Sequence, residues 1–85
     1  MLFMVIERFR DGYQSVGQRF KEQGRMVPED VTYRGSWITE EGDACYQVME
    51  AENAEALQPW IAKWYDLVAF EVIPVLTSAD FWSDK

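Results

Sequence analysis

The stretch that decides the fold is Trp60–Leu76, which reads W-I-A-K-W-Y-D-L-V-A-F-E-V-I-P-V-L. Its first half places apolar residues at helical spacing, and its second half, Phe70–Leu76, is rich in β-branched residues. The pattern predicts a helix that runs almost directly into a strand. Because Pro74 has no backbone N–H to donate to a neighbour, we expect this strand to lie at an edge of a sheet.

Three more strands and one more helix are predicted upstream. Together with Phe70–Leu76, the expected strands are Leu2–Phe9, Val31–Ile38 and Ala44–Glu50. The first expected helix ends at Gly24, and the second runs from the N-cap Asn53 to about Val68. The order is the β-α-β-β-α-β of the ferredoxin-like arrangement. We therefore predict an α+β fold, with a four-stranded antiparallel sheet and two helices on one face. We also expect its first and third strands to be central and parallel to each other.

Several positions carry a more specific expectation. The first strand is apolar on both faces as far as Ile6, which indicates that both faces of the sheet are buried. In the second strand, alternation puts Tyr33 and Trp37 on one face, and Gly35 marks a bulge or an edge position. Pro59 should kink the second helix or stand at its true start, because a proline inside a helix removes a hydrogen bond.

The composition favours one small domain that associates with a copy of itself. The chain has 85 residues, of which 48% are apolar and 15% aromatic, a large share for a core of this size. We expect a domain over residues 1–76 and a tail over residues 77–85, whose Phe81 and Trp82 dock on their own domain or on a partner subunit. The apolar surplus predicts a homodimer through the helix-free face of the sheet.

Charge and residue usage exclude several classes of function. The formal net charge is −7, so binding to a nucleic-acid backbone or to an anionic membrane is not expected. With one cysteine and no histidine, the chain offers neither an internal disulfide nor a zinc pattern. We expect no cofactor and no metal. The short apolar run Met1–Ile6 lacks the features of a signal peptide, so the expected location is cytoplasmic.

The chain from Leu2 to Leu76 also resembles a known family. The matching residues are Met4, Val5, Arg19, Phe20, Gly24, Pro28, Glu29, Trp37, Glu50, Ala56, Leu57 and Trp60, and the most distinctive run is Trp64, Asp66, Leu67, Phe70, Glu71, Val72, Pro74, Val75 and Leu76. On these residues the chain resembles the short bacterial proteins called domain of unknown function 3303 (DUF3303), within the dimeric α/β-barrel group. The resemblance implies two ferredoxin-like sheets that face each other, and no established activity. Some members carry a histidine beside the strand-two tryptophan, where this chain has Ile38.

Carboxylates are the best candidates for chemistry, since histidine is absent. If the central strands are parallel, Glu7, Glu50 and Glu71 lie near one another at one edge of the sheet, with Arg8 beside them. Glutamates held close together and partly buried have raised pKa values, so one of them could transfer protons or help bind a divalent cation. The alternative is that these glutamates are solvated, or that Arg8 pairs with Glu71.

The aromatic residues allow a second kind of site. Five of them are candidates for the wall of an apolar pocket between subunits, namely Tyr33, Trp37, Tyr46, Trp60 and Trp64. The alternative is that they form the core, where aromatic residues dominate in small domains. Cys45 is expected to be an inert buried thiol.

Three functions are therefore open. The first is a homodimeric domain that binds or senses a small molecule in an apolar pocket. The second is a cofactor-free isomerase or monooxygenase-like enzyme, with a glutamate as general base and Tyr33 or Tyr46 as donor. The third is a structural or interaction module whose sheet face only makes the dimer.

Overall fold

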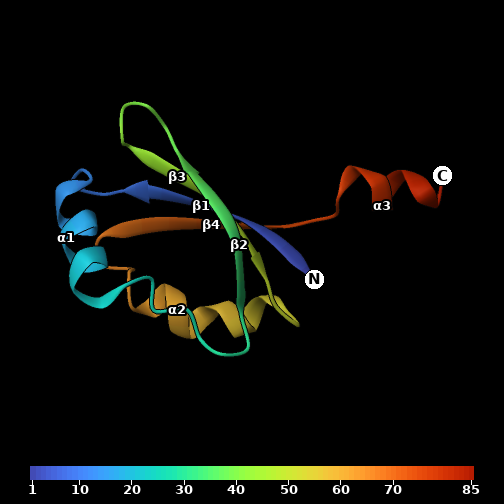
Figure 1. Ribbon diagram of the computed structural model, residues 1–85, viewed down its shortest axis with the longest axis horizontal. Helices are drawn as coiled ribbons and strands as arrows, with labels where there is room; N and C mark the ends of the chain where they lie inside the picture. Colours follow the sequence, from blue (N-terminus) through green and yellow to red (C-terminus); the bar gives the residue numbers. More distant parts are fainter.

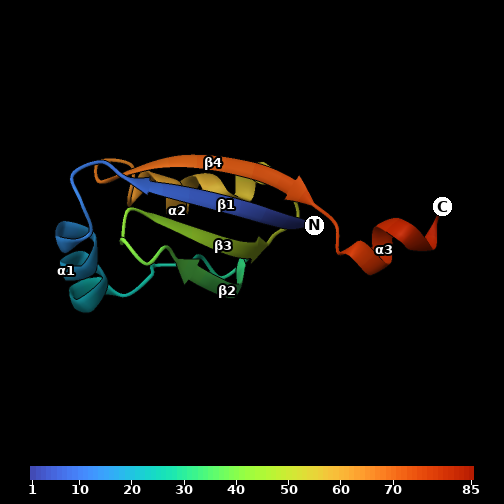
Figure 2. The same cartoon turned by 90° about the horizontal axis from the view of Figure 1, so that it is seen from above.

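Four strands form one antiparallel sheet in the computed structural model, which describes residues 1–85. The strands are β1 (Leu2–Phe9), β2 (Thr32–Ile38), β3 (Ala44–Glu50) and β4 (Val68–Val75), and they pair in the order β2-β3-β1-β4. Figure 2 shows them side by side. Helix α1 (Gln14–Gln23) connects β1 to β2, and α2 (Gln58–Ala62) precedes β4. The predicted α+β fold with ferredoxin-like βαββαβ topology is confirmed.

The two central strands, β1 and β3, run antiparallel, so the expectation that they are parallel is wrong. Leu2 lies opposite Glu50, and Arg8 lies opposite Ala44. The crossover through α1 leaves β2 running in the same direction as β1, and the hairpin at residues 39–43 then reverses the chain into β3. The carboxyl ends of β1 and β3 therefore lie at opposite ends of the sheet, measured along the strands.

The second helix is shorter than predicted and is broken in two. Asn53 does act as a cap, since its Oδ1 accepts the N–H of Ala56 at 3.0 Å, but it caps a 3₁₀ turn, η1 (Ala54–Leu57). Pro59 lies in the first turn of α2, where its missing N–H costs nothing. The chain turns again over residues 63–67 and enters β4 at Val68, two residues earlier than predicted. No helix combines the length and the apolar character needed to cross a membrane.

The core lies between the sheet and α2. Phe3 and Val5 of β1 are fully buried and pack with Leu57 and Trp60. The Trp60 ring meets Phe70 of β4 edge-on, with ring centroids 5.4 Å apart. Helix α1 lies on the same side of the sheet but near its end, as Figures 1 and 2 show. Thus α2 closes the core, and α1 does not.

The alternation of β2 breaks at Gly35, where the expected bulge is confirmed. Pairing with β3 shifts register between Tyr33 and Gly35, whose φ of +155° suits glycine. Because a bulge inserts one residue, Tyr33 and Trp37 lie on opposite faces of the sheet, and the prediction that they share a face is wrong. Tyr33 Oη lies 2.6 Å from Ser36 Oγ on the helix side, whereas Trp37 pairs with Tyr46 on the other side.

The face of the sheet away from the helices is uncovered in the single chain. We call it the open face; its larger apolar residues are Leu2, Met4 and Ile6 of β1, Trp37 of β2, Tyr46 and Val48 of β3, and Ile73 and Val75 of β4. The β1 residues are half-buried, and Trp37 is 64% exposed. Burial of the first strand on both sides, as predicted, is therefore not achieved within one chain.

The tail forms a short helix, α3 (Ser78–Ser83), that extends away from the sheet (Figure 1). Thr77 Oγ1 caps it by accepting the N–H of Asp80 at 3.0 Å. Phe81 and Trp82 pack edge-on with centroids 5.0 Å apart, and Trp82 is 67% exposed. The tail covers neither face of its own sheet, so its docking on a partner subunit stays a prediction.

Candidate functional site

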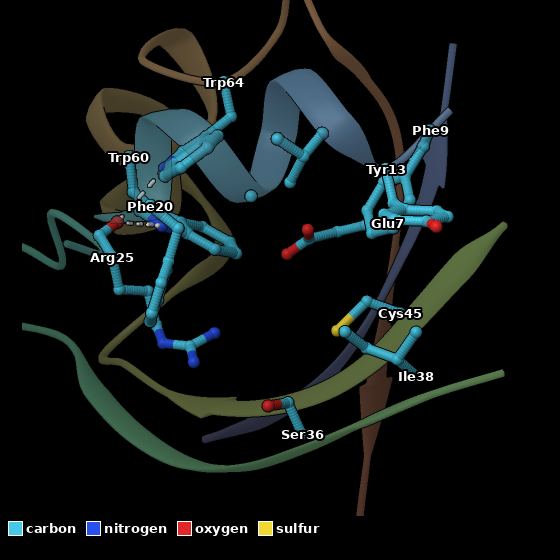
Figure 3. Close-up of a pocket in the computed structure, with 12 residues that line it drawn as sticks. Glu7, Phe9, Tyr13, Phe20, Arg25, Ser36, Ile38, Cys45, Trp60 and Trp64 are labelled. Atoms are coloured by element: carbon cyan, nitrogen blue, oxygen red, sulfur yellow. Dashed lines mark hydrogen bonds between the residues drawn. The ribbon is translucent and has the colours of Figure 1, made fainter. Parts of the chain in front are cut away.

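A hollow of about 330 Å³ lies between α1 and the helix-facing side of the sheet (Figure 3). It is lined by Glu7, Phe9, Tyr13, Val16, Gly17, Phe20, Arg25, Ser36, Ile38, Cys45, Trp60 and Trp64, and we call it the α1 hollow. It exists because α1 stands off from the sheet. No residue of α1 is buried, and a Cβ atom added at Gly17 would meet nothing within 4 Å.

Glu7 points into the α1 hollow from β1 (Figure 3). Its neighbours in the sheet are Cys45 of β3 and Phe70 of β4, and only 9% of its surface is exposed. Burial raises the pKa of Glu7 to about 7, against the lowering effects of the Arg25 charge and of the hydrogen bond that Gln47 Nε2 donates. This carboxyl therefore gains and loses its proton near neutral pH.

Arg25 brings the only basic side chain to the α1 hollow. Its Nη1 donates to Gln47 Oε1 at 2.6 Å, so the fully buried Gln47 links Arg25 to Glu7. Arg25 and Glu7 form no direct ion pair. The guanidinium carbon lies 4.0 Å from the ring centroid of Tyr33 and 5.1 Å from that of Phe20. Two aromatic rings thus hold this cation beside the hollow.

The backbone at Arg25 is fixed by two tryptophans, Trp60 of α2 and Trp64 of the turn that follows α2. Trp60 Nε1 and Trp64 Nε1 both donate to the Arg25 carbonyl oxygen, each at 3.1 Å. On either side of Arg25, Gly24 and Met26 have φ values of +72° and +62°. A non-glycine residue in this left-handed region costs about 1 kcal/mol, so the loop depends on contacts such as these two bonds.

Cys45 lies in the wall of the α1 hollow and is buried, as expected. Burial, and then the negative charge of Glu7, raise the pKa of the Cys45 thiol to about 11. The thiol is therefore protonated at neutral pH and is a poor nucleophile.

The three candidate glutamates do not lie together, contrary to the prediction. Glu50 accepts from Arg34 Nε at 2.8 Å at the far end of the sheet from Glu7, because β3 runs antiparallel to β1. Glu71 lies on the opposite face of the sheet, where Arg8 approaches it to 3.7 Å, the alternative that the sequence had left open. No group of acidic and cysteine side chains gathers that could hold a metal ion. Of the three glutamates, only Glu7 lines the α1 hollow.

The aromatic candidates also divide between the two faces. Trp60 and Trp64 line the α1 hollow, and Tyr33 borders it through its contact with the arginine. Trp37 and Tyr46 lie on the open face, so they share no pocket with the other three within one chain.

Sequence reasoning missed Arg25 and Gln47. A usable signal existed for Gln47, which occupies the same face of β3 as buried Cys45 and Met49 and so needs a polar partner. Arg25 gave no such signal, because it follows Gly24 in a loop whose path depends on the two distant indoles.

Comparison with known proteins gives one result. The family model of the domain of unknown function DUF3303 matches residues 1–83. The chain belongs to this family. The resemblance seen in the sequence is thereby confirmed at the level of the family, and its place among dimeric α/β barrels stays a prediction. No curated protein and no solved structure matches this DUF3303 chain. Ile38, which stands where some family members were expected to have histidine, lies in the wall of the α1 hollow.

Replacing Glu7 with glutamine is expected to change how the free energy of unfolding depends on pH. The folded chain holds the Glu7 proton with a pKa of about 7, against an ordinary value of 4.5. Binding of this proton therefore stabilises the folded chain by about 3 kcal/mol. That stabilisation is fully present below pH 4.5 and is lost as the pH rises through 7. At about pH 8, Glu7→Gln should be more stable than the parent by up to that amount.

Urea unfolding at several pH values measures this difference, which should vanish near pH 4.5. Glu71→Gln is the matched control, because Glu71 is exposed and its ion pair is worth less than about 1 kcal/mol. Parallel pH curves for Glu7→Gln and the parent would show that Glu7 is not buried as described.

Proposed function

We propose that this DUF3303 protein binds a small, mostly apolar molecule in the α1 hollow. The observation that carries the proposal is a cavity of about 330 Å³ with a mainly hydrophobic wall and two convergent polar groups, Glu7 and Arg25. Ligand sites in proteins have this size and composition. A core of this small size would otherwise be close-packed, so unfilled space beside a helix that buries no residue favours a ligand.

A second candidate is a cofactor-free enzyme that moves a proton. Glu7 favours it, because a general base works best with a pKa near the working pH, and this carboxyl faces the cavity. Tyr33 could assist only through Ser36, to which its hydroxyl is bonded, and Tyr46 lies on the wrong face. The variant Glu7→Gln separates the two candidates. An enzyme would lose its turnover and keep its affinity for the ligand, whereas a binding protein has no turnover in either form.

Filling the α1 hollow from α1 should abolish binding without unfolding the chain. Gly17→Leu adds a side chain where nothing lies within 4 Å, and it removes a glycine from a helix interior, a gain of about 0.5–1 kcal/mol. With the neutral probe 2-naphthol, followed by backbone amide chemical shifts, the parent should respond around α1 and β3. Gly17→Leu should weaken that response about tenfold or more.

The matched control is Ser15→Leu, which places the same side chain on the exposed side of the same helix. It should bind 2-naphthol like the parent. Equal binding by Gly17→Leu and Ser15→Leu would remove the α1 hollow as the site and would favour the structural module instead.

We also propose that two copies pair through the open face. Its charged residues are already paired within the chain, Arg8 with Glu71 and Arg34 with Glu50, so the face offers a neutral apolar surface. The open face of a second copy is equally neutral and apolar, so the two faces can bury each other. Helix α3, which extends beyond the sheet (Figure 2), supports this proposal because it carries the exposed pair Phe81 and Trp82.

Light scattering at micromolar concentration should therefore give twice the mass of the chain. Ile73→Lys introduces a charge on the open face and should yield the monomer, because burying an unpaired charge is costly. Gln23→Lys, on the exposed end of α1, is the control and should remain dimeric. A monomeric parent would contradict this proposal.

A further inference from the structure

We propose that the ligand of the α1 hollow is a small apolar carboxylate whose head group is bound by the Arg25 guanidinium. This inference rests on the proposed function and names the chemical class of the ligand. The apolar body would lie against the hydrophobic wall formed by Val16, Ile38 and the two tryptophans.

The first support is that Arg25 lacks a carboxylate partner. Arg8, Arg19 and Arg34 each pair with an acidic side chain. Arg10 also lacks an acidic partner, but it is exposed and donates to the Tyr65 carbonyl oxygen. The chain has 15 acidic residues against 8 basic ones, so partners are abundant. Arg25 nevertheless pairs with none of them, and its only hydrogen-bond acceptor in the protein is the neutral Gln47. An unpaired, half-buried cation beside an apolar cavity is suited to an anion that comes from outside.

The second support is the geometry of the guanidinium. An arginine has five N–H groups in a rigid plane, which match the two oxygens of a carboxylate. Only Nη1 of Arg25 is committed, by its bond of 2.6 Å to Gln47. The rings of Phe20 and Tyr33 lie against the guanidinium, which restricts its movement. Figure 3 shows the head group directed toward the space that Glu7 also faces.

The third support concerns the charge that the ligand must carry. Arg25 is the only basic side chain in the wall, and the Cys45 thiol is neutral. Glu7 is mostly protonated a little below neutral pH, so it can donate a hydrogen bond to a carboxylate instead of repelling it. One cation with one neutral acid matches a single negative charge. A doubly charged phosphate would leave one charge without a partner in a chain that is itself acidic.

The test compares two probes of nearly equal shape, 2-naphthoate and 2-naphthamide, by calorimetry at about pH 6. The parent should bind the carboxylate about tenfold more tightly than the amide. Arg25→Gln should remove the preference, so that both probes bind alike. Lys21→Gln removes an exposed basic side chain from α1 and should leave the preference unchanged.

Arg25→Lys provides a second variant, because it keeps the charge but loses the planar fork, and it should keep a reduced preference for 2-naphthoate. It decides the question if Arg25→Gln does not fold by circular dichroism. Equal affinity of the parent for the two probes would overturn this inference, as would a preference that both Arg25 variants retain in full.

These results separate this inference from the proposed function. If both probes bind equally and Gly17→Leu blocks both, the α1 hollow is a ligand site for neutral molecules, and only the carboxylate assignment fails. If neither probe binds the parent, or if Gly17→Leu blocks neither, the proposed function fails as well.

Discussion

The carbonyl oxygen of Arg25 accepts two indole N–H groups, from Trp60 and Trp64, and the site depends on this shared acceptor. The bonds fasten the end of α1 to the second helical region instead of to the sheet. As a result α1 stands off from β1 and β3, and the space beneath it becomes the α1 hollow. The same bonds place the Arg25 side chain between two aromatic rings at the rim. Architecture and candidate chemistry therefore share one cause.

Glu7 gives the α1 hollow its character at a cost in stability. A carboxyl in this position is buried among apolar neighbours with only Gln47 as a bonded partner, and its charged form is disfavoured there. A hydrophobic residue would suit the fold better, since Phe3 and Val5 occupy the equivalent positions earlier in β1. A residue that weakens the fold while it faces a cavity is typical of a functional site.

Most of the fold could be predicted from local pattern, and most of the site could not. The apolar run of the first strand and the alternation of the second predicted those strands, and Gly35 predicted the bulge, because these signals act over a few residues. Strand direction, which decided that Glu50 lies far from Glu7, follows from how the connections cross. Arg25 reaches the α1 hollow only because Trp60 and Trp64, which follow it by 35 and 39 positions, donate to its carbonyl oxygen. No local signal encodes such a contact.

The candidate site depends on Glu7 being a buried carboxyl that titrates near neutral pH at the wall of an apolar cavity. The most direct measurement is the side-chain carboxyl ¹³C chemical shift of Glu7, followed by NMR as the pH is changed. The structure predicts a midpoint at about pH 7. A midpoint near 4.5, the ordinary value for glutamate, would show that the Glu7 carboxyl lies in water and not in the wall of an apolar cavity.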